Sequence, residues 1–109
     1  MSERSPEILL ADIREALSKI FTYTQGLDER TFAENSLVVD AVLRNIEVIG
    51  EAASKLPEDF VSAHPEIEWR KIVGMRNRLI HGYFGVSLGL VWQTIQGNLP
   101  GLRDKLNQL

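Results

Sequence analysis

Two side chains with complementary chemistry, Arg76 and His81, stand five residues apart in this 109-residue chain. With a reference pKa of about 6.5, histidine can accept and donate a proton near neutral pH. Arginine offers a planar set of donors that matches a phosphate. Together they suffice for RNA cleavage without a metal, since one group can move the 2′-hydroxyl proton while the other stabilises charge on phosphorus. No Asp, Glu or His cluster shows metal-ligand spacing, which agrees with a site that needs no metal or other cofactor.

The spacing of Arg76 and His81 is weak support for a site when it is taken alone. Cations near a helix C-terminus complement the helix dipole, so a structural interpretation of the pair is favoured on this pattern. On an ideal helix the two positions differ by about 140° and would not touch. Both side chains could still face one groove if the last turn loosens before Gly82.

The neighbours of this pair have alternative interpretations. Tyr83 would by default pack in the core, whereas an exposed Tyr83 would be available for stacking on a base or for modification. Asn77 and Arg78 are candidate auxiliary contacts next to Arg76. The residues themselves leave these alternatives open.

Charged residues also repeat at helical spacing farther back in the chain. Asp40 and Arg44 are i,i+4, and Arg44 and Glu47 are i,i+3. A surface ion-pair ladder, contributing roughly a few tenths of a kcal/mol, is the favoured interpretation. The alternative is that Asp40 and Arg44 help to organise the site.

The composition bounds the class of protein. With 44% apolar and 25% charged residues, the chain is expected to fold rather than to be disordered. A net charge of −3 argues against coating of DNA or RNA, although a small basic pocket remains compatible with an acidic body. The absence of cysteine excludes disulfides and thiolate catalysis. Without a basic leader or an apolar run of about 20 residues, we expect a cytoplasmic protein with no membrane contact.

Helical periodicity predicts an all-α bundle of four to five helices running up and down, in one domain over residues 1–109. Four long helical stretches are expected, at about residues 6–25, 36–57, 69–82 and from 86 onward. Ser5 should cap the first helix and Gly26 stop it, while Ser36 can cap the second. Pro100 should kink or restart the last. No segment shows the sustained alternation of a strand.

Several residues have a predicted environment. Phe32, Trp69 and Trp92 are expected in the core, and His64 is expected in solvent. Gly50 costs about 1 kcal/mol relative to alanine in the middle of a helix, so a close contact with a helix or a subunit would account for it.

Beyond these local patterns, the sequence resembles HepT-type HEPN domain proteins over nearly its whole length. The resemblance rests on ordered blocks at matching spacing: DAVLRNIEVIGEAA (residues 40–53), PEIEW (65–69), RNRLIHGY (76–83), Trp92, and Leu99 with Pro100. The family pattern usually has an acid where this chain has Ser87, and Gly89 is unusual near a helix start. These departures concern the stability of the last helix rather than the motif.

The resemblance implies a dimerising helical bundle in which the Arg-x4-His motifs of two subunits face one cleft. It implies a metal-independent ribonuclease toxin whose antitoxin is a minimal nucleotidyltransferase of the MntA type, able to adenylylate the tyrosine of Arg-x4-His-x-Tyr. The matching positions are Arg76, His81 and Tyr83. Adenylylation would place phosphate charge and bulk beside the cleft and block RNA.

Three functional hypotheses follow. The first is a homodimeric endoribonuclease toxin with RNA as substrate, in which His81 transfers the proton and Arg76 holds the phosphate. The second is a non-catalytic dimeric module that docks a nucleotidyltransferase and can hold nucleotide, which the acidic net charge slightly favours. The third is a purely structural bundle. RNA digestion in EDTA separates the first from the others.

Overall fold

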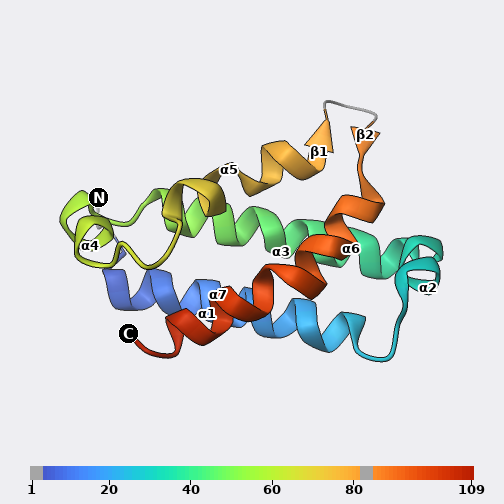
Figure 1. Ribbon diagram of the computed structural model, residues 1–109, viewed down its shortest axis with the longest axis horizontal. Coiled ribbons are helices and arrows are strands. Elements are labelled where there is room, and N and C mark those ends of the chain that lie inside the picture. The colour runs from blue at the N-terminus through green and yellow to red at the C-terminus, as the bar shows by residue number, and fades with distance from the viewer. Residues whose placement is uncertain (1–3, 82–84) are drawn as a thin grey trace.

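The computed structural model describes residues 4–81 and 85–109, and Tyr83 lies outside the described residues. The described residues form an all-α bundle, as predicted (Figure 1). Its helices are α1 (Pro6–Thr24), α2 (Glu29–Glu34), α3 (Ser36–Ser54), α4 (Glu58–Ala63), α5 (Trp69–Leu79), α6 (Leu88–Gly97) and α7 (Leu99–Leu106). The short helices α2 and α4 lie at opposite ends of the bundle. Among the residues that the structure describes, no helix is long and apolar enough to cross a membrane.

The first helix begins and ends as its sequence predicts. Ser5 accepts a hydrogen bond from the backbone N–H of Ile8 at 3.3 Å, and Pro6 is the first helical residue, where its missing N–H costs nothing. Gly26, just past the helix, has a φ of +80°, a conformation that other residues rarely adopt. Arg14 of α1 donates a hydrogen bond to the carbonyl of Leu106, the last residue of α7, at 2.7 Å, and this bond ties the two helices together.

The central helix is α3, which packs between α1 and α5, as its apolar residues on more than one face predict. The predicted cap is wrong by one residue. Asn35, not Ser36, accepts from the N–H of Val38 at 3.1 Å, and Ser36 is the first residue of the helix. Both residue types are good caps, and the turn from α2 puts the asparagine in the capping position.

Gly50 lies where α3 and α5 approach each other closely. A Cβ atom at this position would stand 3.5 Å from the carbonyl oxygen of Val73 and 3.7 Å from that of Ile72. The glycine of α3 therefore faces the backbone of α5, which confirms the helix–helix contact expected for it.

The end of α5 differs from the prediction. The helix stops at Leu79 rather than at Gly82, and Ile80 is extended, with φ −116° and ψ 112°. Ile80 and His81 form the two-residue strand β1, which pairs antiparallel with β2 (Gly85–Val86). A β-branched residue favours the extended form, and the ladder pairs backbone groups that a continuing helix would have paired within itself. Figure 1 shows β1 and β2 projecting from the side of the bundle that faces away from α1.

The last helical region consists of two helices, α6 and α7, which meet at Asn98. Pro100 lies in the first turn of α7, so the predicted restart is confirmed. Ser87 occupies the N-cap position of α6, and its side chain makes no capping hydrogen bond.

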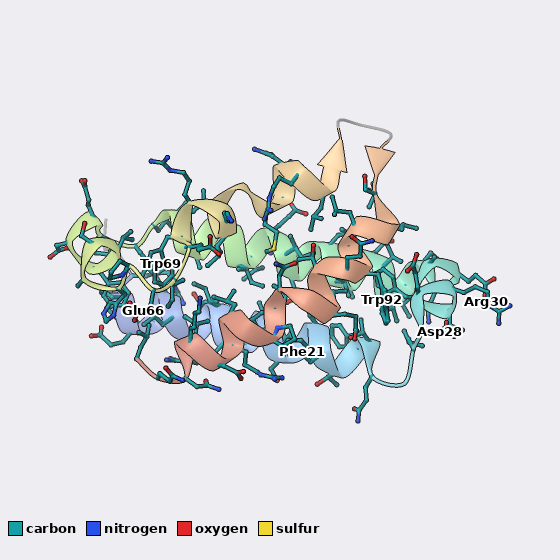
Figure 2. All side chains as sticks on the ribbon, in the orientation of Figure 1. Phe21, Asp28, Arg30, Glu66, Trp69 and Trp92 are labelled. Carbon is teal, nitrogen blue, oxygen red and sulfur yellow. The ribbon has the colours of Figure 1, made fainter. Side chains whose placement is uncertain are left out.

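The predicted core residues are largely correct. Phe32 is fully buried, and its ring packs against Trp92 with 5.3 Å between centroids. Trp69 is buried near the opposite end of the bundle (Figure 2), and its indole donates to the carbonyl of His64 at 3.0 Å. The prediction for His64 is wrong: its ring is half-buried and packs at a tilt against Phe60, with 4.6 Å between centroids. The hydrogen bond from Trp69 to the backbone carbonyl of His64 keeps this residue close to the bundle.

Candidate active site

Arg76 lies in the last turn of α5 with its side chain directed toward α3. Its Nε is 3.6 Å from Oε2 of Glu47, and both side chains are about half exposed, at 49% and 45%. The Nη1 group also donates to Oδ1 of Asn77 at 3.5 Å, at the long limit for a hydrogen bond. The guanidinium is therefore held mainly at Nε, and its half-exposed side chain leaves Nη2 without a protein partner among the described residues.

The position of this ion pair follows from the packing of α3 against α5. The two helices run antiparallel, and Gly50 of α3 faces Val73 of α5. Glu47 stands three residues before Gly50, and Arg76 stands three residues after Val73, so the same register brings the carboxylate to the guanidinium. The contact of α3 with α5 at Gly50 thus places Glu47 of α3 where it can orient Arg76 of α5.

His81 is placed by β1 rather than by α5. Its backbone pairs with Gly85, while its side chain is not among the described groups. The helical angle of about 140° between Arg76 and His81 does not apply, because the chain becomes extended at Ile80. The two candidate residues come from different elements, a helix end and a hairpin strand.

Arg78, a predicted auxiliary residue, lies on the other flank of α5. Its Nη2 donates to the carbonyl oxygen of Lys71 at 3.1 Å, so the side chain folds back along the helix instead of extending toward Arg76. Asn77, the other predicted auxiliary residue, is in contact with Arg76. The structure brings Asn77 to the arginine and separates Arg78 from it.

The ion-pair ladder predicted on α3 does not form between its described members. Asp40 and Arg44 are exposed, and no ion pair within 4.0 Å joins Asp40 with Arg44 or Arg44 with Glu47. Glu47 instead contacts Arg76 on the neighbouring helix. Glu47 stands one helical turn before Gly50 in the sequence. This spacing is the signal that could have identified Glu47 as a residue of the α3–α5 contact. Surface pairs along one helix are too weak to prevent such an exchange of partners.

Asn45, a polar residue in the middle of α3, has a structural role. It is buried, and its Nδ2 donates to the carbonyl of Ala41 at 2.8 Å, one turn earlier in the same helix. This bond accounts for a buried amide without a ligand.

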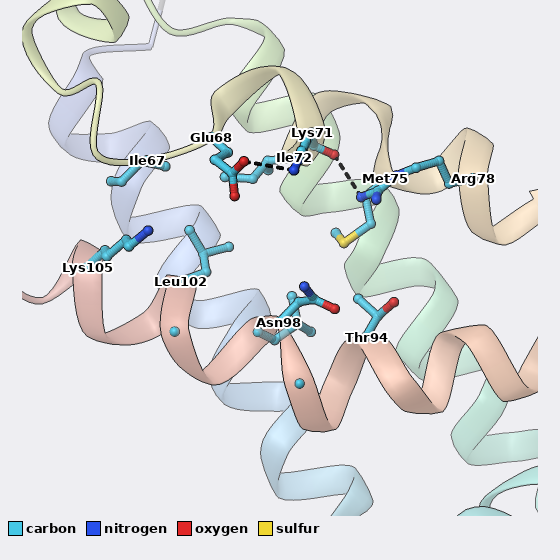
Figure 3. Close-up of a pocket in the computed structure, with 13 residues that line it drawn as sticks. Ile67, Glu68, Lys71, Ile72, Met75, Arg78, Thr94, Asn98, Leu102 and Lys105 are labelled. Atoms are coloured by element: carbon cyan, nitrogen blue, oxygen red, sulfur yellow. Dashed lines mark hydrogen bonds and ion pairs between the residues drawn. The ribbon is translucent and has the colours of Figure 1, made fainter.

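A cavity of about 230 Å³ opens between α5 and the α6–α7 junction (Figure 3). Arg78 lies at its edge together with Lys71 and Lys105, and Glu68 is the carboxylate among its lining residues. The Glu68 carboxylate contacts the Lys71 ammonium at 2.8 Å. This contact is the main reason why the pKa of Glu68 lies below its ordinary value, and the charges of Lys105 and Arg78 lower it further. The cavity is thus more basic than the protein as a whole.

Comparison with known proteins identifies relatives over nearly the whole chain. The model of the family described as "Ribonuclease HepT-like" matches residues 13–109. The "Probable ribonuclease HepT" of Thermococcus cleftensis is 39% identical over 107 residues, covering 98% of this chain and 97% of that protein. A Methanocaldococcus jannaschii protein with RNase in its name is 34% identical, with 97% of each chain covered. No solved structure gives a significant match.

Proposed function

Because this chain belongs to the Ribonuclease HepT-like family, we propose that it is an endoribonuclease that cleaves RNA without a metal at Arg76 and His81. The observation that carries the proposal is the half-exposed guanidinium of Arg76, which contacts Glu47 through Nε and stands five residues before a histidine. Because this guanidinium is partly exposed, it can donate hydrogen bonds to a phosphate without a rearrangement of the core.

In the proposed reaction the 2′-oxygen attacks phosphorus while the bond from phosphorus to the 5′-oxygen breaks. His81 takes part in moving the proton from the 2′-hydroxyl toward the leaving 5′-oxygen. Arg76 binds the non-bridging oxygens and stabilises the charge that develops on them. The products are a 2′,3′-cyclic phosphate and a 5′-hydroxyl, with atoms and charge balanced by the single transferred proton.

The proposed active form is a homodimer in which the Arg76 and His81 residues of both copies face one cleft. Its support is the family membership and the half-exposed side chain of Arg76, which a second copy could contact. Mixing Arg76→Ala and His81→Ala proteins tests this arrangement. Recovery of activity in the mixture supports a shared cleft, whereas two inactive proteins that stay inactive after verified subunit exchange contradict it.

The proposed biological setting is a toxin–antitoxin pair. Its antitoxin would be an MntA-type nucleotidyltransferase that transfers adenylate to the Tyr83 hydroxyl and releases pyrophosphate from ATP. The added phosphate would carry negative charge that can compete with RNA for the arginine. Incubation with the nucleotidyltransferase and ATP should add adenylate to the parent protein and leave Tyr83→Phe unmodified. Modification of Tyr83→Phe at the same rate contradicts the assignment of this tyrosine.

The decisive experiment is digestion of RNA by purified protein in EDTA. The parent should cleave, and Arg76→Ala and His81→Ala should each lose at least about a hundredfold in rate. Arg30→Ala is the control, since Arg30 is an exposed cation on α2, away from the α3–α5 contact (Figure 2). Unchanged cleavage in both active-site variants contradicts the proposed mechanism.

A second candidate function is a non-catalytic dimeric module that docks a nucleotidyltransferase and can hold nucleotide. The net charge of −3 favours it, because a nuclease that binds long RNA usually has a positive surface. This function predicts stable co-purification with the nucleotidyltransferase and no RNA cleavage at any protein concentration.

A further inference from the structure

The cavity between α5 and the α6–α7 junction has the features of a built binding site. Side chains from both walls point toward one another across it (Figure 3). Its floor is apolar, formed by Ile72, Met75 and Leu102, and its rim is polar and charged. An apolar floor with a few converging polar groups is the usual composition of a small-molecule site.

The rim carries a positive charge that the rest of the protein does not share. Lys71, Arg78 and Lys105 line the cavity together with one carboxylate, that of Glu68, whereas the whole chain has a net charge of −3. The Glu68–Lys71 contact at 2.8 Å compensates one of the three cations. Arg78 and Lys105 therefore give the cavity a surplus of positive charge, which favours an anionic ligand.

Arg78 is also held in place at this rim. Its guanidinium donates to the carbonyl of Lys71 through Nη2 at 3.1 Å, which bends the side chain back over the helix. An exposed arginine that is fixed by one of its donors loses less conformational freedom when it binds a phosphate with the others. This arrangement differs from that of a surface arginine extended into solvent.

The opposite wall leaves space for a flat group. Gly97 and Gly101 both line the cavity, and a Cβ atom at either position would have no neighbour within 4 Å. The packing of the bundle does not require glycine at these two positions, which are the last residue of α6 and the third residue of α7. Next to them, Asn98 directs its amide into the cavity, where it can donate and accept hydrogen bonds (Figure 3).

We infer that this cavity binds one nucleotide unit, with the phosphate at Arg78 and Lys105 and the base against Met75, Leu102 and the glycine wall. A volume of about 230 Å³ is small for a ligand site, so part of the nucleotide stays in solvent. The same chemistry is offered by a free mononucleotide and by one unit of an RNA strand. The site is separate from Arg76, which is directed toward α3 on the other flank of α5.

The test is a calorimetric titration of the full-length protein with adenosine 5′-monophosphate, adenosine, inorganic phosphate and a DNA hexamer that lacks the 2′-hydroxyl. Two variants change the cavity in independent ways. The double variant Arg78→Gln, Lys105→Gln removes the surplus charge, and Gly101→Leu puts a side chain into the open wall without changing charge. The control Lys19→Gln, Arg30→Gln removes two exposed cations outside the cavity.

Adenosine monophosphate should bind the parent more tightly than adenosine or inorganic phosphate, and both cavity variants should weaken its binding at least about tenfold. If the cavity variants weaken the binding of the hexamer as well as that of the monophosphate, the cavity takes one unit of a nucleic-acid strand. If they weaken the binding of the monophosphate alone, the cavity takes a free nucleotide. Equal affinity for adenosine or for inorganic phosphate overturns the inference, as does unchanged binding in both cavity variants. Arg76→Ala should bind adenosine monophosphate normally even if it no longer cleaves RNA, so this inference and the proposed nuclease function can fail separately.

Discussion

Glu47 of α3 and Arg76 of α5 form an ion pair across the contact between the two helices, with 3.6 Å between Oε2 and Nε. The pair lies one helical turn from the place where Gly50 meets the backbone of α5 at Val73. Since both side chains are about half exposed, the pair contributes little to folding, on the order of 0–1 kcal/mol. The ion pair instead orients the guanidinium of Arg76, which we propose binds RNA.

If Arg76 is the phosphate-binding residue, Glu47→Ala should lower kcat for RNA cleavage by roughly 10–100-fold, because a misplaced guanidinium stabilises the transition state less well. Glu47→Gln keeps an oxygen that can accept from Nε and should lose less. Glu51→Ala is the matched control, since Glu51 lies one turn farther along α3 and pairs with Lys55. Steady-state kcat and KM, measured beside the unfolding temperature, decide the matter. Equal kcat in Glu47→Ala and Glu51→Ala contradicts a positioning role.

Gly50→Ala should raise the free energy of unfolding by up to about 1 kcal/mol, because alanine favours the helix and its Cβ would make an ordinary contact at 3.5 Å. Gly50→Leu should instead lower it by roughly 1–3 kcal/mol, since a longer side chain overlaps the backbone of α5. Gly74→Leu is the control, because a Cβ at Gly74 meets nothing within 4 Å. Urea denaturation measures all three. Equal stability of the two leucine variants would show that the α3–α5 approach is not tight at Gly50.

The cap of α2 should make stability depend on acid. Asp28 accepts from the backbone N–H of Thr31 at 2.8 Å, and this bond is the main reason why the pKa of Asp28 lies below its ordinary value of 3.8. A lowered pKa in the folded state adds stability above pH 3.8, and that stability is lost as the pH falls through the folded pKa. The parent should therefore lose stability relative to Asp28→Asn below pH 3.8, with a constant difference near neutrality. The assignment is contradicted if the free energy of unfolding falls by the same amount in both proteins as the pH is lowered through this range.

Phe32 should be the main anchor of α2. Its side chain is fully buried and packs against Trp92, so Phe32→Ala should lower the free energy of unfolding by about 3–5 kcal/mol. Leu37→Ala is a matched control from the neighbouring helix, because Leu37 is 81% exposed, and its effect should stay within about 0.5 kcal/mol. Chemical denaturation, with tryptophan fluorescence as the signal, compares them. A similar loss in both variants contradicts the anchoring role.

The sequence alone determined the features that depend on residues near one another in the chain. The start of α1 at the Ser5 cap and its end before Gly26 follow from local backbone preferences. The burial of Phe32 and the restart of the last helix at Pro100 also follow from residue type and spacing. The ordered blocks identified the family correctly, because several motifs at matching distances are far more specific than one Arg–His pair.

Only the tertiary structure decided how the candidate site is assembled. Helix α5 ends at Leu79 because Ile80 finds a strand partner in Val86, six residues away, and helical periodicity carries no signal of such a partner. Glu47 pairs with Arg76 rather than with Arg44, and Arg78 turns to the carbonyl of Lys71. Exposed ion pairs differ from one another by roughly a few tenths of a kcal/mol, so the packing of one helix against another chooses among them.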